Sequence, residues 1–158
     1  MGMHPHRWRF NMNTGETKHE SIDDLCAEFP MGNFSVAGRK MRYGYYSLMN
    51  WGILGMTGLV KYDFDTGKRE VFRYGNGRIG SEAPFAPKIG AKDEDDGYIV
   101  TYITDMIEKS SECTVFDAKD IAKGPVARIL LPKQIAGSSH SYWAPGDQIV
   151  SDWKSRAA

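Results

Sequence analysis

The sequence predicts an all-β protein made of short strands that recur along the chain. Three observations support this fold class. The 158 residues contain 17 glycines and many aromatic and β-branched residues, a composition that favours strands and tight turns. Helical periodicity is nearly absent, since the best helix candidate, 118–123, is one turn long and is followed by Gly124-Pro125. A strand-turn motif also recurs at an interval of about fifty residues.

The strands are predicted from short runs of apolar or alternating residues, each flanked on both sides by residues that favour turns. In chain order the predicted strands are Trp8–Met12, Arg42–Leu48, Leu59–Phe64, Tyr98–Thr104, Cys113–Phe116 and Val126–Leu131.

The recurring motif runs from a strand into a turn that carries a glycine. Phe10–Glu16 matches Tyr62–Lys68, and Val115–Asp120 forms a third, looser copy. A repeat of about fifty residues with several short strands is typical of a β-propeller blade, and an antiparallel sandwich with similar turns is the alternative. At this interval the chain supplies about three blades, whereas a closed propeller needs roughly four to eight. We therefore expect part of a ring.

Charge and composition indicate which kinds of partner and which cellular location are expected for this chain. Lys plus Arg and Asp plus Glu both number 20, so no long-range field attracts nucleic acid. No apolar run approaches the roughly 18 residues that cross a bilayer, and the N-terminus resembles neither a signal nor a transit peptide, so a cytoplasmic location is expected. Cys26 and Cys113 form no CxxC pair and are expected to be free, small, buried residues.

His140 is the first candidate for chemistry. It follows an apolar strand and lies among small residues in the segment Leu131–Ala144, so its imidazole could approach a ligand closely. A neutral imidazole suits iron, zinc or copper. A single histidine cannot hold a catalytic metal, so any such site needs further ligands.

Two glutamates, Glu28 and Glu82, lie among apolar residues and prolines. A carboxylate in such surroundings needs a partner, and the outer ring nitrogen of a metal-bound histidine would provide one. A glutamate that caps a turn is the alternative. His4, His6 and His19 are interpreted as surface residues, and the acidic run 92–97 as a tight turn rather than a calcium loop.

In this order and spacing, the sequence resembles the C-terminal third of the carotenoid cleavage oxygenases, the family of carotenoid, apocarotenoid and lignostilbene dioxygenases. The resemblance covers nearly the whole chain. The segments that carry it are His6–Phe10, Glu28–Pro30, Arg42–Tyr45, Gly58–Asp63, Gly80–Pro87, Glu94–Tyr98 and Leu131–His140.

The resemblance implies a seven-bladed β-propeller with Fe(II) on its axis, held by four histidines, three of them backed by glutamates. His140 corresponds to the last iron ligand, and Glu28 and Glu82 to two of the glutamates. No other residue is assigned a catalytic role. The remaining ligands would precede Met1, so residues 1–158 are expected to form the C-terminal part of a single propeller domain, about its last three blades, with the N-terminal blades absent. Serines at 139 and 141 replace the aromatic and glycine residues that often flank this ligand in the family.

The implied function is the C-terminal portion of a non-haem iron dioxygenase. Such an enzyme cleaves a C=C bond of a carotenoid, apocarotenoid or stilbene to carbonyl products, with O2 and an apolar alkene as substrates. Its apolar tunnel would come from loops on one face of the propeller, and the long stretch 47–57, with Trp51, Ile53, Leu54 and Met56, is expected to be one of these loops. Peripheral membrane contact of the full-length protein is left open, and nucleic acid is not expected as a partner. The alternative is a non-catalytic β-module, inactive alone because three of the four iron-ligand histidines are missing.

Overall fold

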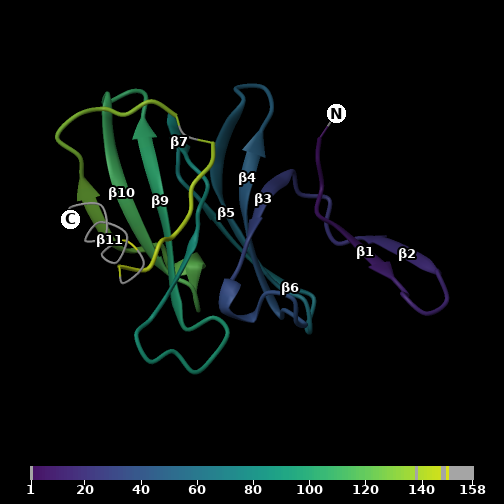
Figure 1. Ribbon diagram of the computed structural model, residues 1–158. Coiled ribbons are helices and arrows are strands. Elements are labelled where there is room, and N and C mark those ends of the chain that lie inside the picture. The colour runs from purple at the N-terminus through teal and green to yellow at the C-terminus, as the bar shows by residue number, and fades with distance from the viewer. Residues whose placement is uncertain (1, 138, 147–148, 150–158) are drawn as a thin grey trace, which may run out of the picture.

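The computed structural model describes residues 2–137, 139–146 and 149, and antiparallel strands dominate it (Figure 1). The all-β prediction is confirmed. The strands are β1 (His6–Phe10), β2 (Thr17–Ser21), β3 (Ala27–Met31), β4 (Tyr43–Asn50), β5 (Gly55–Asp63), β6 (Lys68–Arg73), β7 (Arg78–Gly80), β8 (Phe85–Pro87), β9 (Gly97–Asp105), β10 (Ser110–Asp117) and β11 (Pro125–Leu130), and the 3-10 helices are η1 (Phe34–Val36) and η2 (Ile121–Lys123).

Two four-stranded meanders form the body of the protein. The first meander contains β3 to β6 and the second contains β8 to β11. The short strand β7 links them because it pairs with both β5 and β9. Strands β1 and β2 form a separate N-terminal hairpin, which projects to one side of the meanders in Figure 1. The described residues thus form two complete blade-like units and one hairpin.

The repeated turn has the same hydrogen bonds in its first two copies. The Gly15 N–H donates to the Asn11 carbonyl at 2.8 Å, and the Gly67 N–H donates to the Asp63 carbonyl at 2.8 Å. The φ angles of the two glycines are 74° and 71°, a left-handed conformation that glycine adopts without strain. In the third copy the Asp117 side chain accepts the Lys119 N–H at 2.9 Å, and the chain enters η2 instead. The first two copies of the sequence repeat therefore form the same turn, and the third copy forms a different one.

The main hydrophobic core lies between the two meanders. Tyr45 and Leu59 of the first meander pack in one cluster with Ile99 and Phe116 of the second. The Phe72 ring lies 5.0 Å from that of Phe116, edge to face. Face-to-face packing of neighbouring four-stranded units is how propeller blades bury their apolar surfaces.

A buried ion pair also joins the meanders. The Lys61 ammonium of β5 lies 3.0 Å from the Asp95 carboxylate and donates to the Lys119 carbonyl at 3.0 Å. Both charged side chains are almost fully buried, which requires this pairing. The Tyr45 hydroxyl donates to the Ala118 carbonyl at 2.9 Å. The acidic run 92–97 was predicted as a tight turn. One of its carboxylates, that of Asp95, forms the ion pair with Lys61 of the first meander.

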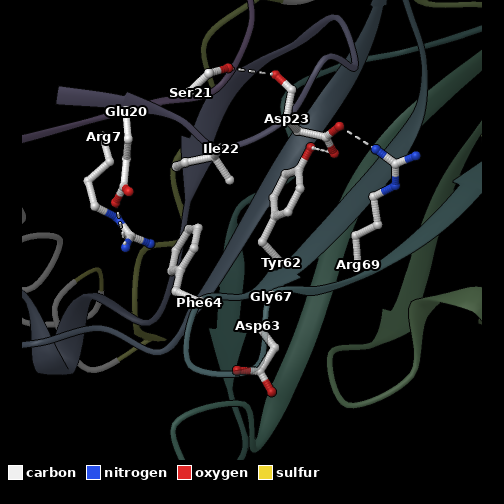
Figure 2. Close-up of a pocket in the computed structure, with 10 residues that line it drawn as sticks. All are labelled: Arg7, Glu20, Ser21, Ile22, Asp23, Tyr62, Asp63, Phe64, Gly67 and Arg69. Carbon is white, nitrogen blue, oxygen red and sulfur yellow. Dashed lines mark hydrogen bonds and ion pairs between the residues drawn. The ribbon is translucent and has the colours of Figure 1, made fainter.

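The N-terminal hairpin is anchored to the first meander through Asp23, which lies at the edge of a pocket of about 390 Å³ (Figure 2). The Tyr62 hydroxyl donates to the Asp23 carboxylate at 2.8 Å, and the Arg69 guanidinium forms an ion pair with the same carboxylate. On the other side of this pocket, the Arg7 guanidinium lies 5.1 Å from the Phe64 ring centroid. One buried acid and one cation–π contact thus fix the hairpin.

Several local expectations need adjustment. The stretch 47–57, expected as a long loop, is a β-hairpin in which β4 runs to Asn50 and β5 begins at Gly55. Cys26 and Cys113 are free, as expected, but half-buried rather than buried, and partial burial raises the pKa of the Cys113 thiol. The helix candidate 118–123 is the short 3-10 helix η2.

Within the described ranges, no helix is long and apolar enough to cross a membrane.

Candidate metal centre

Glu82 lies in the segment that leads into the innermost strand of the second meander, and its neighbours hold it rigidly. The Ser81 N–H donates to the Tyr102 carbonyl at 2.9 Å, and the Thr101 hydroxyl donates to the Ser81 carbonyl at 3.1 Å. The Ser81 hydroxyl donates to the carbonyl of Glu82 itself at 2.9 Å. The Glu82 side chain is only 5% exposed, so its carboxylate needs protein partners.

His140 supplies one of these partners. After β11 the chain folds back across the second meander, and the His140 Nδ1 atom lies 3.0 Å from Glu82 Oε1. An ionised carboxylate only accepts hydrogen bonds, so Nδ1 is the donor in this contact, and in the neutral form of the imidazole the lone pair then lies on Nε2. The imidazole is 83% exposed among the described residues, so this lone pair is accessible to a ligand. Glu82, expected to support a histidine, is therefore in direct contact with His140 in the structure.

Ser141 supplies the other partner. Its N–H donates to Glu82 Oε2 at 2.7 Å, and its hydroxyl donates to the Glu82 carbonyl at 3.2 Å. Sequence reasoning considered Ser141 only as a small neighbour and missed this role. Because the two carboxylate oxygens bind consecutive residues, Glu82 orients the ring and fixes the backbone that carries it.

Phe29 places the first meander beside the same imidazole. Its ring meets that of His140 edge-on, with 6.0 Å between the centroids. Phe29 has a φ of 55°, which is unusual for a residue other than glycine, and the register of β3 against β4 shifts between Glu28 and Met31. Nothing in the sequence signals this conformation at a phenylalanine.

Glu28 occupies the equivalent place in the first meander. It lies 54 residues before Glu82, and it pairs with Ser47, whereas Ser81, the residue before Glu82, accepts a hydrogen bond from Thr101. Glu28 is half-buried, and its carboxylate forms no hydrogen bond with the residues that the structure describes. The hydroxyl of Ser47, which is 1% exposed, also has no partner there. The structure therefore brings Glu82 to a histidine but leaves Glu28 without one in the described part of the chain.

The other histidines lie apart from this centre. His6 and His19 belong to the N-terminal hairpin, where His6 Nε2 lies 2.9 Å from His19 Nδ1 and both rings pack against Trp8. The His4 ring hydrogen-bonds to the Leu25 carbonyl at 3.2 Å. Over residues 2–137, 139–146 and 149, no group of three or more His, Cys, Asp or Glu side chains could hold a metal ion. His140 is the metal-ligand candidate that these contacts leave.

Comparisons with known proteins find similarity over most of the chain. Residues 2–145 match the family model described as retinal pigment epithelial membrane protein (RPE65). The chain is 34% identical over 161 residues to carotenoid 9,10(9',10')-cleavage dioxygenase 1 of Pisum sativum, covering 92% of this chain and 30% of that protein. It is 27% identical to isoeugenol monooxygenase of Pseudomonas nitroreducens, covering 88% of this chain and 32% of that protein.

Solved structures give the same result. The crystal structure of Pseudomonas brassicacearum lignostilbene dioxygenase superimposes with a TM-score of 0.81 at 28% identity, covering 89% of this chain and 32% of that one. An apocarotenoid oxygenase of Synechocystis superimposes equally well at 24% identity, which supports the fold alone. The chain thus spans about a third of the length of the relatives that it matches.

Proposed function

Because the chain belongs to the RPE65 family, which includes the carotenoid cleavage dioxygenases, we propose that it forms the part of an iron-dependent dioxygenase that contributes His140 to the metal. The observation that carries the proposal is the hydrogen bond between His140 Nδ1 and Glu82. It leaves the Nε2 lone pair accessible on an imidazole whose orientation is fixed. A carboxylate that accepts the outer N–H of a histidine is the usual support of a metal-ligating imidazole.

Iron(II) fits the donors of this chain only if other parts of the full-length protein supply further ligands to the same ion. His140 offers one neutral nitrogen ligand, and Glu82 acts through it without binding metal. We propose that further histidines come from blades outside this chain, and that Glu28 receives the N–H of one of them. The unpaired carboxylate of Glu28 and the orphan hydroxyl of Ser47 support a partner from outside the described residues.

The proposed reaction is oxidative cleavage of a C=C bond by O2 into two carbonyl products, with an extended apolar alkene of the carotenoid or stilbene class as substrate. The relatives that support this substrate class are a carotenoid cleavage dioxygenase and lignostilbene dioxygenases. When bound, iron would supply the open coordination position for O2. The residues of this chain would orient one ligand imidazole and exclude water from Glu82. The free thiols of Cys26 and Cys113 suit a cytoplasmic enzyme.

The test is metal retention by the full-length protein that carries this segment. We expect His140→Ala to abolish stoichiometric iron, measured by elemental analysis after gel filtration. We expect Glu82→Gln to weaken iron binding about 10- to 100-fold, because the amide cannot accept both N–H groups. His19→Ala and Glu20→Gln, both exposed and remote from the centre, are the matched controls. Unchanged iron content in His140→Ala would refute the ligand assignment.

A second candidate is a non-catalytic β-module. It is favoured for the isolated 158-residue chain because the described residues hold no group of three metal-ligating side chains. This chain should therefore bind iron weakly and show no O2-dependent cleavage of a stilbene or apocarotenoid. Tight, stoichiometric iron in the isolated chain would contradict the module hypothesis.

A further inference from the structure

The segment that carries His140 is attached to the second meander at a second point, six residues before Ser141. Ile135 hydrogen-bonds through both of its backbone groups to a pair of buried hydroxyls on β9 and β10. Its N–H donates to Ser111 Oγ at 3.0 Å, and its carbonyl accepts from Thr104 Oγ1 at 3.3 Å. Thr104 and Ser111 are cross-strand partners, and their hydroxyls lie 2.9 Å apart.

These contacts define the direction of every hydrogen bond in the group. Thr104 donates its only hydroxyl proton to the Ile135 carbonyl, so the proton shared with Ser111 must come from Ser111 and be donated to Thr104 Oγ1. The Ser111 oxygen in turn accepts from the Ile135 N–H. Each hydroxyl thus donates once and accepts once in a closed ring. Ser111 is 1% exposed and Thr104 is 7% exposed, so loss of one hydroxyl leaves the other with one hydrogen bond fewer in a largely buried position.

Side-chain packing does little to hold the chain between Ile135 and His140. Ala136, Gly137 and Ser139 are exposed, and a Cβ added at Gly137 would have no neighbour within 4 Å. The described part of this segment is therefore held by polar contacts at its two ends. One end is the hydroxyl pair, and the other is Glu82, which binds His140 and Ser141.

We propose that Thr104 and Ser111 are positioning residues for His140. Their hydroxyl pair fixes the backbone at Ile135 so that the chain reaches Glu82 with the imidazole in place. The consequence for catalysis rests on the proposed function, in which His140 binds the metal. The positioning itself is a property of this chain and can be measured without iron.

The experiment uses the isotopically labelled 158-residue chain. Amide hydrogen exchange is followed at Ile135 and Ser141, and the ring 15N shifts of His140 report its tautomer. In Thr104→Val the hydroxyl is lost with little change of volume. We expect exchange at both amides to accelerate about tenfold, and the ring shifts to move towards those of a free imidazole with mixed tautomers. Thr104→Ser, which keeps the hydroxyl, should restore all three signals.

The matched control is Thr114→Val. Thr114 is 1% exposed on the same strand pair, but its hydroxyl donates to Glu112 at 3.2 Å and does not touch the segment. Loss of this hydroxyl should leave the amide exchange rates of Ile135 and Ser141 and the ring 15N shifts of His140 unchanged. Ser111→Ala is a second, milder variant in case Thr104→Val fails to fold, and it should reproduce the signature of Thr104→Val.

Three results would overturn the proposal. Ile135 could exchange faster while Ser141 and the His140 shifts stay unchanged, which would mean that Glu82 alone sets the imidazole. Thr114→Val could produce the same changes as Thr104→Val, which would reduce the hydroxyl pair to general stability. Ile135→Ala could displace His140 as much as Thr104→Val, which would assign the effect to packing. Failure of the iron assignment in His140→Ala would leave all these readouts intact, so the two proposals fail separately.

Discussion

The first and second meanders present the same carboxylate in the same place, but only the second brings a histidine to it. Glu28 and Glu82 lie 54 residues apart on corresponding segments. A buried hydroxyl residue lies beside each: Ser47 pairs with Glu28, and Thr101 donates to the carbonyl of Ser81, the residue before Glu82. The difference arises outside the strands, in the segment after β11 that returns to Glu82. The repeated blade therefore supplies the support for a ligand, and a separate segment supplies the ligand itself.

The largest effect should come from the core that the two meanders share. Phe116 is fully buried between them, and its counterpart 54 residues earlier, Tyr62, belongs to a smaller cluster within the first meander. We expect Phe116→Ala to lower the free energy of unfolding by about 3–5 kcal/mol, measured by urea denaturation. Phe10→Ala, at a 66% exposed position, should change it by less than about 0.5 kcal/mol. A small effect at Phe116 would mean that the meanders are stable independently.

The next effect concerns Asp23, which anchors the N-terminal hairpin to the first meander. Burial raises the pKa of Asp23, but hydrogen bonds from Arg69 and Tyr62 outweigh it and hold that pKa well below its ordinary value. The folded protein therefore binds fewer protons at Asp23 than the unfolded chain does. This stabilisation is complete above the ordinary carboxyl pKa of about 3.9 and is lost as the pH falls through the lower folded value.

We expect Asp23→Asn to cost about 2 kcal/mol at neutral pH, because it removes hydrogen bonds to a charged group. The difference from the wild type should shrink on acidification below about pH 4, which urea denaturation over a pH series would show. The exposed neighbour Asp24, changed to Asn, is the control. A difference between Asp23→Asn and the wild type that does not vary with pH would contradict the assigned role.

The smallest effect directly compares the two equivalent hydroxyls. Thr101 donates to the Ser81 carbonyl, whereas Ser47 has no partner among the described residues. We expect Thr101→Val to destabilise the chain by about 1–2 kcal/mol and Ser47→Ala to change it by less than about 0.5 kcal/mol, by thermal and urea unfolding. Equal costs would show that Ser47 is hydrogen-bonded within the chain, and the two meanders would then be alike at this position.

Much of the fold could be predicted from local chemistry. The turns at Asn11 and Asp63 depend on an acceptor side chain and a glycine four residues later, which the sequence displays directly. The candidate site was partly predictable, because Glu82 and His140 are the residue types that such a site needs. The resemblance to a known family then implied that His140 is a metal ligand and that Glu82 supports a ligand histidine.

The rest depends on which segments become neighbours. The positive φ of Phe29 follows from a bulge in β3, and the partners of Ser111 and Thr104 follow from the path of the segment after β11. Lys61 looks like an exposed residue of an alternating strand, but the second meander covers it and supplies Asp95. Short-range patterns do not encode contacts between residues that lie tens of positions apart.

The attachment of the last described segment at two points has a consequence for how this stretch can change. Five peptide bonds, from Ile135 to His140, connect the hydroxyl pair to Glu82. Ala136, Gly137 and Ser139 are exposed, so we expect substitutions at these positions to be tolerated. We expect the length of the segment to be restricted, since one residue more or fewer would shift the imidazole relative to the carboxylate.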